Sequence, residues 1–373
     1  MITLITKACK RKSLFNRLEK NRIKIINYFN TSSVYQDEQS SKNLGLPPSS
    51  FVTNRPMKGS SSVATIKNEN IKKSVFISQS NDIFTNLALE DWLYRHFDFR
   101  THHVLLLWVN DPCVVIGRHQ NPFMEANVSE LSSQGVIIAR RNSGGGAVFH
   151  DRGNLNCTFF TPRERYNRKY NLNILTRAIF REWAIKSDIN ERDDICINQK
   201  KVSYISNSTL SVRSPIKNLC EINRNVNISQ LIAAVGYEYL RTFATELEDG
   251  GNQQIMKQLG FQLINPTEKW FPGIDNLRTE FSSWEWNYGR TPKFTVKKEL
   301  ILKDSDKEHK IILNIAVEKG IINGVTITMP NNERLPVVSS LQHKNYNESN
   351  LNKILNALKL ACTDNIMQAI NSH

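Results

Sequence analysis

Apolar residues between positions 80 and 97 recur at every fourth place, at Phe84, Ala88 and Trp92. This spacing puts their side chains on one face of a helix. Just before it, the triplet Ser-Asn-Asp at residues 80–82 offers side chains that can cap a helix N-terminus. The pattern therefore predicts an amphipathic helix over residues 80–97.

Helical apolar spacing recurs in residues 170–186, and helices are also predicted at residues 228–243 and 350–370. Short apolar runs bounded by turn residues are typical of strands. These runs are residues 104–109, 113–117, 136–139 and 155–160, followed near the end of the chain by residues 294–303, 310–318 and 324–329. The mixture predicts an α/β (α+β) fold with a small C-terminal α+β accessory domain.

The segment from Arg140 to Asp151 joins two of these predicted strands and contains three consecutive glycines. Three glycines lose side-chain packing and cost chain entropy, so they favour a place where a ligand lies against bare backbone. Free amide N–H groups there can bind an anion, and a fixed guanidinium can neutralise it. The alternative is a glycine hairpin beside solvated arginines. The segment is neither a Walker loop nor a dinucleotide fingerprint, because it lacks Gly-Lys-Ser/Thr and is followed by a strand.

Residues 140–156 resemble the signature of the lipoate-protein ligase and lipoyltransferase family. That signature reads Arg-Arg-x-Ser-Gly-Gly-Gly-x-Val-Phe/Tyr-His-Asp-x-Gly-Asn-x-Asn and stands intact here. The resemblance continues in residues 86–92 and 115–122, and it extends over nearly the whole chain after about residue 73. It points to the mitochondrial lipoyltransferase branch.

The resemblance implies a catalytic domain of the class II synthetase and biotin-protein-ligase type over residues 73–292, with the accessory domain over residues 293–373. The implied reaction transfers a lipoyl group from lipoyl-AMP to a lysine of a carrier protein. The implied carriers are the lipoyl domains of 2-oxoacid dehydrogenase E2 subunits and the glycine-cleavage H protein. Synthesis of the adenylate from lipoate and ATP with Mg²⁺, and transfer of biotin or octanoate, remain alternatives.

A second segment of the family falls at Lys201-Val202-Ser203, after a turn predicted at Asn198-Gln199. In the family, Lys-Ile/Val-Ser-Gly-Ser/Thr-Ala supplies the lysine that holds the activated acyl group and its phosphate. The match ends at Tyr204, and the family's next strand, with its paired histidines, is not found. A catalytically impaired protein that only binds lipoyl domains is therefore a further alternative.

The resemblance thus implies one catalytic residue, Lys201, and a set of substrate-binding residues on or beside the glycine segment. These are Arg118, Arg141, Ser143, Gly144, Gly145, Gly146, Ala147, Val148, Phe149 and His150. Arg118 is either a ligand contact or a solvated strand end. His150 is either a general base or a structural residue, and the structural interpretation is preferred because a lysine amine can lose its proton to phosphate or solvent.

Charge is concentrated in the head of the chain, which changes how the net charge of +14 is interpreted. Residues 1–30 carry eight Lys/Arg and one acidic residue, interleaved with apolar positions. This pattern predicts a mitochondrial presequence and hence a matrix location, with a disordered basic tail as the alternative. Residues 31–72 are rich in Ser, Asn, Gln and Pro and predict a disordered linker. The remaining body is nearly neutral, so nucleic acid is not an expected partner.

Two other composition features limit the function classes. No apolar run approaches the roughly 20 residues of a membrane helix, so no membrane partner is expected. The six cysteines are widely spread without a Cys-x-x-Cys pair, which predicts a reducing compartment and no bound metal cofactor. Cys113 and Cys157 lie in apolar strands and are predicted to be buried thiols. The aromatic residues of 284–292 are predicted to belong to a core rather than a binding surface.

Overall fold

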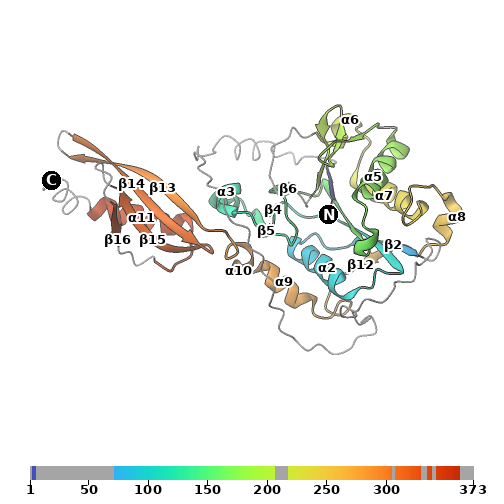
Figure 1. Ribbon diagram of the computed structural model, residues 1–373, viewed down its shortest axis with the longest axis horizontal. Coiled ribbons are helices and arrows are strands. Elements are labelled where there is room, and N and C mark those ends of the chain that lie inside the picture. Colours follow the sequence, from blue (N-terminus) through green and yellow to red (C-terminus); the bar gives the residue numbers. More distant parts are fainter. Residues whose placement is uncertain are drawn as a thin grey trace. The chain divides into compact units, whose positions relative to one another are not determined.

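A computed structural model describes residues 2–5, 71–205, 217–304, 307–328, 334–337 and 342–361 (Figure 1). The chain divides into two compact units. The first unit comprises the described residues of 1–111, 151–205 and 214–277, and the second comprises those of 112–150 and 278–373. No helix among the described residues is long and apolar enough to cross a membrane.

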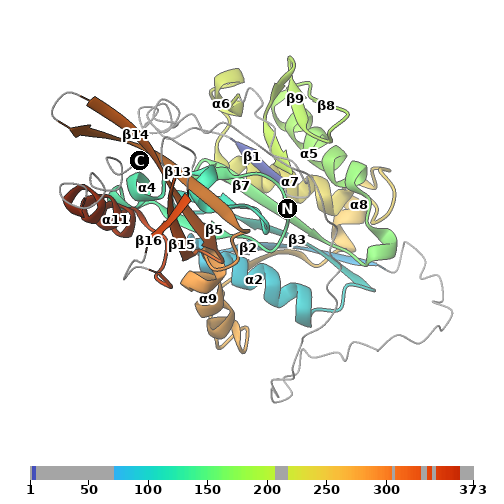
Figure 2. The same ribbon diagram turned by 60° about the vertical axis from the view of Figure 1, so that its left-hand side comes forward.

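A mixed six-stranded sheet forms the centre of the first unit (Figure 2). Its strands in spatial order are β11 (Ser203–Ile205), β1 (Ile2–Ile5), β7 (Asn154–Phe160), β3 (His102–Trp108), β2 (Lys72–Ser78) and β12 (Gly260–Ile264). The pairs β12–β2 and β2–β3 are parallel, whereas β3–β7, β7–β1 and β1–β11 are antiparallel. Strands β3 and β7 confirm predicted strands, while β1, β2 and β12 were not predicted.

Strand β1 comes from the head of the chain, inside the segment predicted as a presequence. Its register places Leu4 opposite Leu155 of β7 and opposite Ser203 of β11. Strand β11 has no neighbour other than β1 in this sheet as far as the structure describes it. The attachment of β11 to the sheet therefore depends on residues 2–5.

Helices cover the sheet of the first unit. The longer ones are α2 (Ile83–His96), α5 (Arg168–Trp183) and α7 (Ile228–Arg241), which confirm the three helices predicted in this region. Shorter ones are η2 (Arg163–Arg165), α6 (Leu219–Ile222) and α8 (Gly251–Met256), and α9 (Ile274–Ser282) spans the boundary between the units. The carboxylate of Asp82 accepts hydrogen bonds from the backbone N–H and the hydroxyl of Thr85, which fixes the start of α2.

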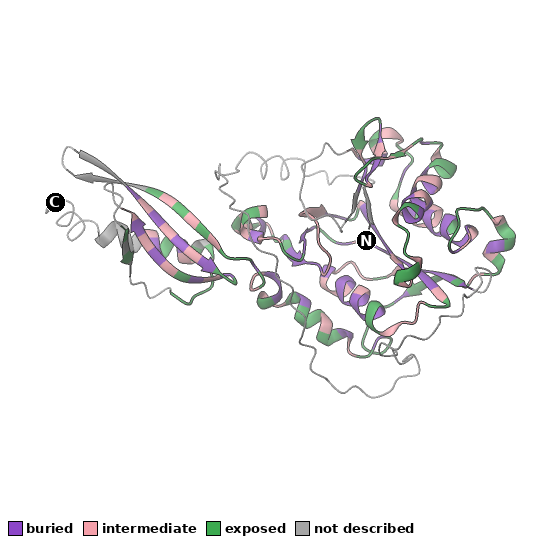
Figure 3. Cartoon of the chain, viewed as in Figure 1, coloured by how far each residue is buried: buried purple, intermediate pink, exposed green. Residues whose placement is uncertain are grey.

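The main core forms where α5 and α7 pack against the sheet, and their buried faces are visible in Figure 3. Leu172 and Leu175 of α5, Leu231 and Val235 of α7, and Leu155 of β7 are all fully buried. Burying one such side chain stabilises the fold by about 1.5–3 kcal/mol. Apolar burial therefore holds both helices on the sheet.

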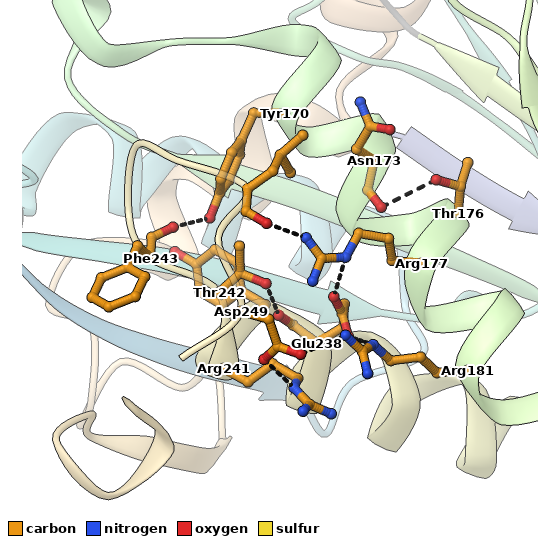
Figure 4. Close-up of polar contacts among 12 residues, drawn as sticks. Tyr170, Asn173, Thr176, Arg177, Arg181, Glu238, Arg241, Thr242, Phe243 and Asp249 are labelled. Atoms are coloured by element: carbon orange, nitrogen blue, oxygen red, sulfur yellow. Dashed lines mark hydrogen bonds and ion pairs between the residues drawn. The ribbon is translucent and has the colours of Figure 1, made fainter. Parts of the chain in front are cut away.

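An ion-pair network also joins α5 to α7 (Figure 4). The carboxylate of Glu238, which is 1% exposed, lies 2.7 Å from Nε of Arg177 and 2.9 Å from Nε of Arg181. Asp249 adds contacts of 2.5 Å to Arg181 and 2.8 Å to Arg241. Two guanidinium groups thus compensate a carboxylate that would be costly to bury alone.

A small three-stranded sheet completes the first unit. Its strands are β10 (Lys200–Lys201), β9 (Ile195–Ile197) and β8 (Asp188–Ile189), in that spatial order. The turn between β9 and β10 contains Asn198 and Gln199, with φ of 49° and 63°. Left-handed backbone at both positions is typical of a tight hairpin turn. The hairpin predicted at Asn198-Gln199 is therefore confirmed.

The second unit contains a three-stranded sheet near the glycine segment. Its strands are β5 (Ile137–Arg140), β4 (Cys113–Ile116) and β6 (Val148–His150), accompanied by α3 (Pro122–Glu125), α4 (Val128–Ser133) and α10 (Trp284–Asn287). Strand β4 pairs in parallel with β5 and antiparallel with β6. Trp286 of α10 is 5% exposed, which confirms that the aromatic segment contributes to a core.

The second unit also contains an antiparallel four-stranded sheet and a helix. These elements are β13 (Phe294–Asp304), β14 (Lys307–Glu318), β15 (Ile321–Thr328), β16 (Arg334–Val337) and α11 (Glu348–Ala361). Every second residue from Ile311 to Val317 is buried, and Leu351 and Ile354 of α11 join this core. The α+β fold class with a C-terminal accessory fold is confirmed. The predicted end of the last helix, residues 362–370, lies outside the described residues.

Candidate functional site

The glycine segment forms a loop between β5 and β6, and it lies directly against the end of β4. A Cβ atom added to Gly117 would be 2.0 Å from the carbonyl oxygen of Gly145. The backbone N–H of Arg118 also donates to the carbonyl of Ser143 at 2.9 Å. Gly145 itself has φ of 98°, a conformation that favours glycine. The close approach of the two chain segments therefore requires glycine at positions 117 and 145.

The guanidinium group of Arg141 binds carbonyl groups of this loop. Its Nη2 atom donates to the carbonyl oxygens of Gly144 and Gly146, both at 2.8 Å, and Nε reaches Gly144 at 3.2 Å. Because C=O and the following N–H point in opposite directions in a trans peptide, the amides of Gly145 and Ala147 face away from Arg141. Such outward amide groups are suited to an anion.

The exposure of the loop agrees with a binding surface. Residues 142–149 are all of intermediate exposure, whereas Arg141 is only 2% exposed. The residues from Ser143 to Phe149 are therefore partly accessible, while the Arg141 guanidinium is occupied with loop carbonyls. Arg118 has an exposed side chain beside the loop.

His150 lies at the end of β6, opposite Cys113 of β4, and is fully buried. Burial, with a smaller contribution from the positive charge of Arg141, lowers the pKa of His150 to about 3. The imidazole is therefore neutral at physiological pH. A buried, uncharged ring favours the structural interpretation over the general base.

Arg140, the first arginine of the pair, is fully buried beneath the loop and was not among the predicted site residues. Burial, assisted by the charge of Arg290, lowers its pKa to about 10, so it keeps its charge at neutral pH. Its guanidinium donates to five carbonyl groups and one hydroxyl, which belong to Gly117, Arg118, Gln120, Trp286, Asn287 and Thr291. These acceptors replace water around the buried cation.

Lys201 lies in β10 of the first unit, within a closely bonded hairpin. Its Nζ atom is 2.6 Å from Oδ1 of Asp194, and the two side chains are 15% and 9% exposed. The backbone N–H of Ile195 donates to the hydroxyl of Ser203 at 2.8 Å, and that of Lys217 donates to the carbonyl of Lys201 at 2.9 Å. The lysine is thus held at both its backbone and its side chain.

The structure brings the predicted residues together in two groups. Arg118, Arg141 and the residues from Ser143 to His150 form one cluster in the second unit, whereas Lys201 belongs to the first unit. Sequence analysis missed Asp194, Gly117 and Arg140 as site residues. The only signals for these residues in the sequence were the position of Gly117 at the end of a predicted strand and that of Arg140 next to Arg141.

The buried cysteines do not offer a nucleophile. Cys113 is 1% exposed and Cys157 is fully buried, which confirms the prediction of buried thiols. Burial raises the pKa of the Cys157 thiol far above its usual range. A thiol in this state is inert, because the thiolate is the reactive form.

Comparison with known proteins assigns the family. Residues 82–209 match the family described as the lipoyl protein ligase A/B catalytic domain. The chain is 34% identical over 295 residues to the mitochondrial lipoyl amidotransferase LIPT1 of Homo sapiens, covering 67% of this chain and 74% of that protein. The chain belongs to the lipoate-protein ligase and lipoyltransferase family. The family resemblance identified from the signature is therefore confirmed, and with it the class of acyltransferases.

Two further proteins are similar to this chain. Lipoate-protein ligase A of Psychrobacter cryohalolentis is 29% identical over 261 residues, covering 60% of this chain and 75% of that protein. A crystal structure of P. falciparum LipL1 in complex with lipoate has 24% sequence identity and a TM-score of 0.47, covering 68% of this chain and 84% of that one.

Proposed function

We propose that the protein transfers a lipoyl group from lipoyl-AMP to a specific lysine of lipoyl domains. The observation that carries this proposal is the loop in which Arg141 holds the carbonyls of Gly144 and Gly146. The amides of Gly145 and Ala147 then face the opposite side, where the phosphate of an acyl-adenylate would accept their hydrogen bonds. Membership of the family indicates that the transferred acyl group is lipoyl.

The reaction needs an activated acid, because a carboxylate is a poor partner for an amine. In lipoyl-AMP the lipoyl carbonyl is joined to the phosphate as a mixed anhydride. The ε-amine of the carrier lysine attacks this carbonyl, an amide bond forms, the bond between carbonyl carbon and phosphate oxygen breaks, and AMP leaves. The proton of the amine passes to phosphate or solvent. Donors aimed at the phosphate and the developing oxyanion lower the barrier.

Lys201 is proposed, from its place in the family motif, as the donor that holds the acyl carbonyl and the phosphate together. In the described structure its ammonium group is paired with Asp194. To contact the ligand, the Lys201 ammonium group must therefore either leave Asp194 or bind Asp194 and the ligand together. Removing one such donor from an active site typically lowers the rate about a hundred- to thousandfold.

Several finer assignments belong to the same proposal. The carriers are E2 lipoyl domains and the glycine-cleavage H protein, and residues 73–292 and 293–373 are the catalytic and accessory domains. A mitochondrial matrix location is supported by the mitochondrial relatives and the basic head, residues 1–30. The protein uses lipoyl-AMP as substrate. Formation of that adenylate from lipoate and ATP with Mg²⁺ is the alternative to be tested.

The deciding experiment incubates the full-length chain with lipoyl-AMP and an apo lipoyl domain, and follows the mass of the carrier. A gain of one lipoyl group is expected, at a single lysine identified by peptide mapping. A well-folded protein that binds the carrier without acylating it would replace the enzyme with the lipoyl-domain binder. Parallel reactions with lipoate, ATP and Mg²⁺ test adenylation, and those with octanoyl-AMP and biotinyl-AMP test acyl specificity.

A further inference from the structure

Arg140 joins two segments that are far apart in the sequence. On one side, its Nη1 atom donates to the carbonyl oxygens of Gly117 at 3.3 Å, Arg118 at 2.9 Å and Gln120 at 2.7 Å. Three carbonyl groups of residues 117–120 thus converge on one nitrogen. Residues 117–120 are the same residues that support the glycine loop.

On the other side, Arg140 is bound by the segment that leads into the C-terminal sheet. Its Nε and Nη2 atoms donate to the carbonyls of Trp286 at 3.0 Å and Asn287 at 2.7 Å. The backbone of Arg140 adds two bonds, because its N–H donates to Oδ1 of Asn287 at 2.7 Å and its C=O accepts from Nε1 of Trp286 at 2.7 Å. The two segments are therefore held by a single residue with rigid, planar donors.

The connection continues from residues 117–120 to the glycine loop. Gly117 lies so close to Gly145 that no side chain fits between them, and Arg118 donates its backbone N–H to Ser143 at 2.9 Å. The amide of Gly117 in turn donates to Oε1 of Gln120 at 2.8 Å. A shift of residues 117–120 would therefore displace the backbone of the loop.

We propose that Arg140 is a positioning residue that sets the shape of the ligand-binding loop from the Trp286–Thr291 segment, without touching the ligand. Arg141 orients carbonyl groups within the loop, whereas Arg140 fixes residues 117–120, which contact the loop. The two adjacent arginines thus have different roles. Because a continuous set of hydrogen bonds within the second unit joins the loop to the Trp286–Thr291 segment, the aromatic segment contributes to ligand affinity as well as to the core.

The substitution Arg140→Lys tests this proposal. A lysine ammonium keeps the charge but offers three donors on one nitrogen, so it cannot reach both segments at once. Arg290→Lys is the matched control, because it makes the same substitution within the Trp286–Thr291 segment. The Arg290 side chain stacks on the ring of Trp286 at 3.6 Å and is 43% exposed. Both variants are prepared as full-length protein.

The first measurement is amide hydrogen exchange without any ligand. Arg140→Lys is expected to accelerate exchange about tenfold in residues 117–120 and 143–148, while the C-terminal sheet exchanges as in the parent protein. Arg290→Lys should leave both stretches unchanged. Unchanged exchange in Arg140→Lys, or an equal increase throughout the second unit, would overturn the proposal, since the latter is what a merely structural residue produces.

The second measurement rests on the proposed function and uses lipoyl-AMP as the probe. Arg140→Lys should raise the dissociation constant of lipoyl-AMP about tenfold to hundredfold, with less than a threefold change in the transfer rate at saturation. An equal loss of rate and affinity contradicts a positioning role. If the parent protein binds no lipoyl-AMP, the proposed function fails, but the exchange measurement still decides the coupling.

A milder variant covers the case in which Arg140→Lys does not fold. Trp286→Phe keeps the aromatic ring and removes one donor, the Nε1–H that binds the carbonyl of Arg140. A selective increase in exchange at residues 143–148 supports the proposal. Exchange that matches the parent protein at those residues refutes it.

Discussion

The ammonium group of Lys201 lies 2.6 Å from the carboxylate of Asp194, and both side chains are largely shielded from water. The ion pair bridges β10 and the residue just before β9, so it closes the hairpin that carries the lysine. The same contact occupies the group expected to bind the acyl-adenylate. Asp194 therefore holds Lys201 in place, and under the proposed function it also competes with the acyl-adenylate for the ammonium group.

Replacing Lys201 by alanine should abolish most of the transfer activity. The expected loss is about a hundred- to thousandfold in the single-turnover rate, because one donor to the developing charge is removed. Mass spectrometry of the carrier measures the rate. Lys200→Ala is the matched control in the same strand, since its side chain is exposed. Equal rates for Lys201→Ala and the parent protein would refute the catalytic assignment.

Replacing Asp194 by asparagine should destabilise the first unit by about 1–3 kcal/mol. The substitution leaves a poorly exposed ammonium group without its counter-charge, which costs more than loss of a surface pair. Urea unfolding measures the change. Asp193→Asn is the control, because its pair with Arg168 at 2.9 Å is more exposed. A smaller effect for Asp194→Asn than for Asp193→Asn would contradict the predicted ranking.

Replacing Gly117 by alanine should disrupt the glycine loop. The added Cβ would come within 2.0 Å of the Gly145 carbonyl oxygen, so one backbone segment must move. We expect lipoyl-AMP to bind at least about tenfold more weakly, as measured by calorimetry. Gly324→Ala is a suitable control, since nothing lies within 4 Å of its added Cβ. Normal affinity in Gly117→Ala would show that the loop tolerates displacement.

The low pKa of His150 predicts loss of stability in acid. The unfolded imidazole binds a proton below its usual pKa of about 6.5, whereas the folded one does so only near 3. Between these values the unfolded state binds more protons, so stability falls as pH falls, by about 1.4 kcal/mol per pH unit. At pH 7 the folded imidazole is neutral and the unfolded one is mostly neutral, so this effect is small.

The measurement for His150 compares urea unfolding at pH 7 and pH 5. His150→Gln should lose about 2 kcal/mol less over this interval than the parent protein. His119→Gln, at an exposed position, should keep the parent's dependence. His103 is also buried with a pKa lowered to about 3, so some acid sensitivity remains in His150→Gln. Identical pH dependence in His150→Gln and the parent would contradict the shift.

Replacing residues 2–5 by Gly-Ser-Gly-Ser should remove β1 from the sheet. Strand β7 then loses one neighbour and β11 loses its attachment, so a loss of about 2–4 kcal/mol in unfolding free energy is expected from the missing ladder bonds. A synthetic peptide of residues 1–6 in excess should restore part of it. Full stability of the substituted chain would show that β1 contributes nothing to the sheet.

Local patterns predicted the helices and many strands well, because their signals lie within each element. The spacing at Phe84, Ala88 and Trp92 was sufficient for α2, and the turn at Asn198-Gln199 for the hairpin. Strand β1 was missed because four residues inside a basic head carry no alternation that outweighs their surroundings. Its pairing partners in β7 are residues 154–157, so only tertiary contacts identify it.

The candidate site was likewise predicted only in part from the sequence. The glycine segment and Lys201 were predicted as site residues because each lies in a contiguous family motif. The separate roles of Arg140 and Arg141 were not predicted, since most of the Arg140 acceptors are backbone carbonyls, which any residue provides. Likewise, Asp194 reaches Lys201 across a hairpin whose register had to be known first.

The position of β1 has a practical consequence for purification and for the predicted presequence. Any peptide fused ahead of Ile2 must leave the sheet between two neighbouring strands, β7 and β11. An import protease that trims the head would take this strand with it, so the mature and the precursor forms would differ in their central sheet. An affinity label belongs at the opposite end of the polypeptide, and terminal sequencing of the protein isolated from cells would reveal whether the head is retained.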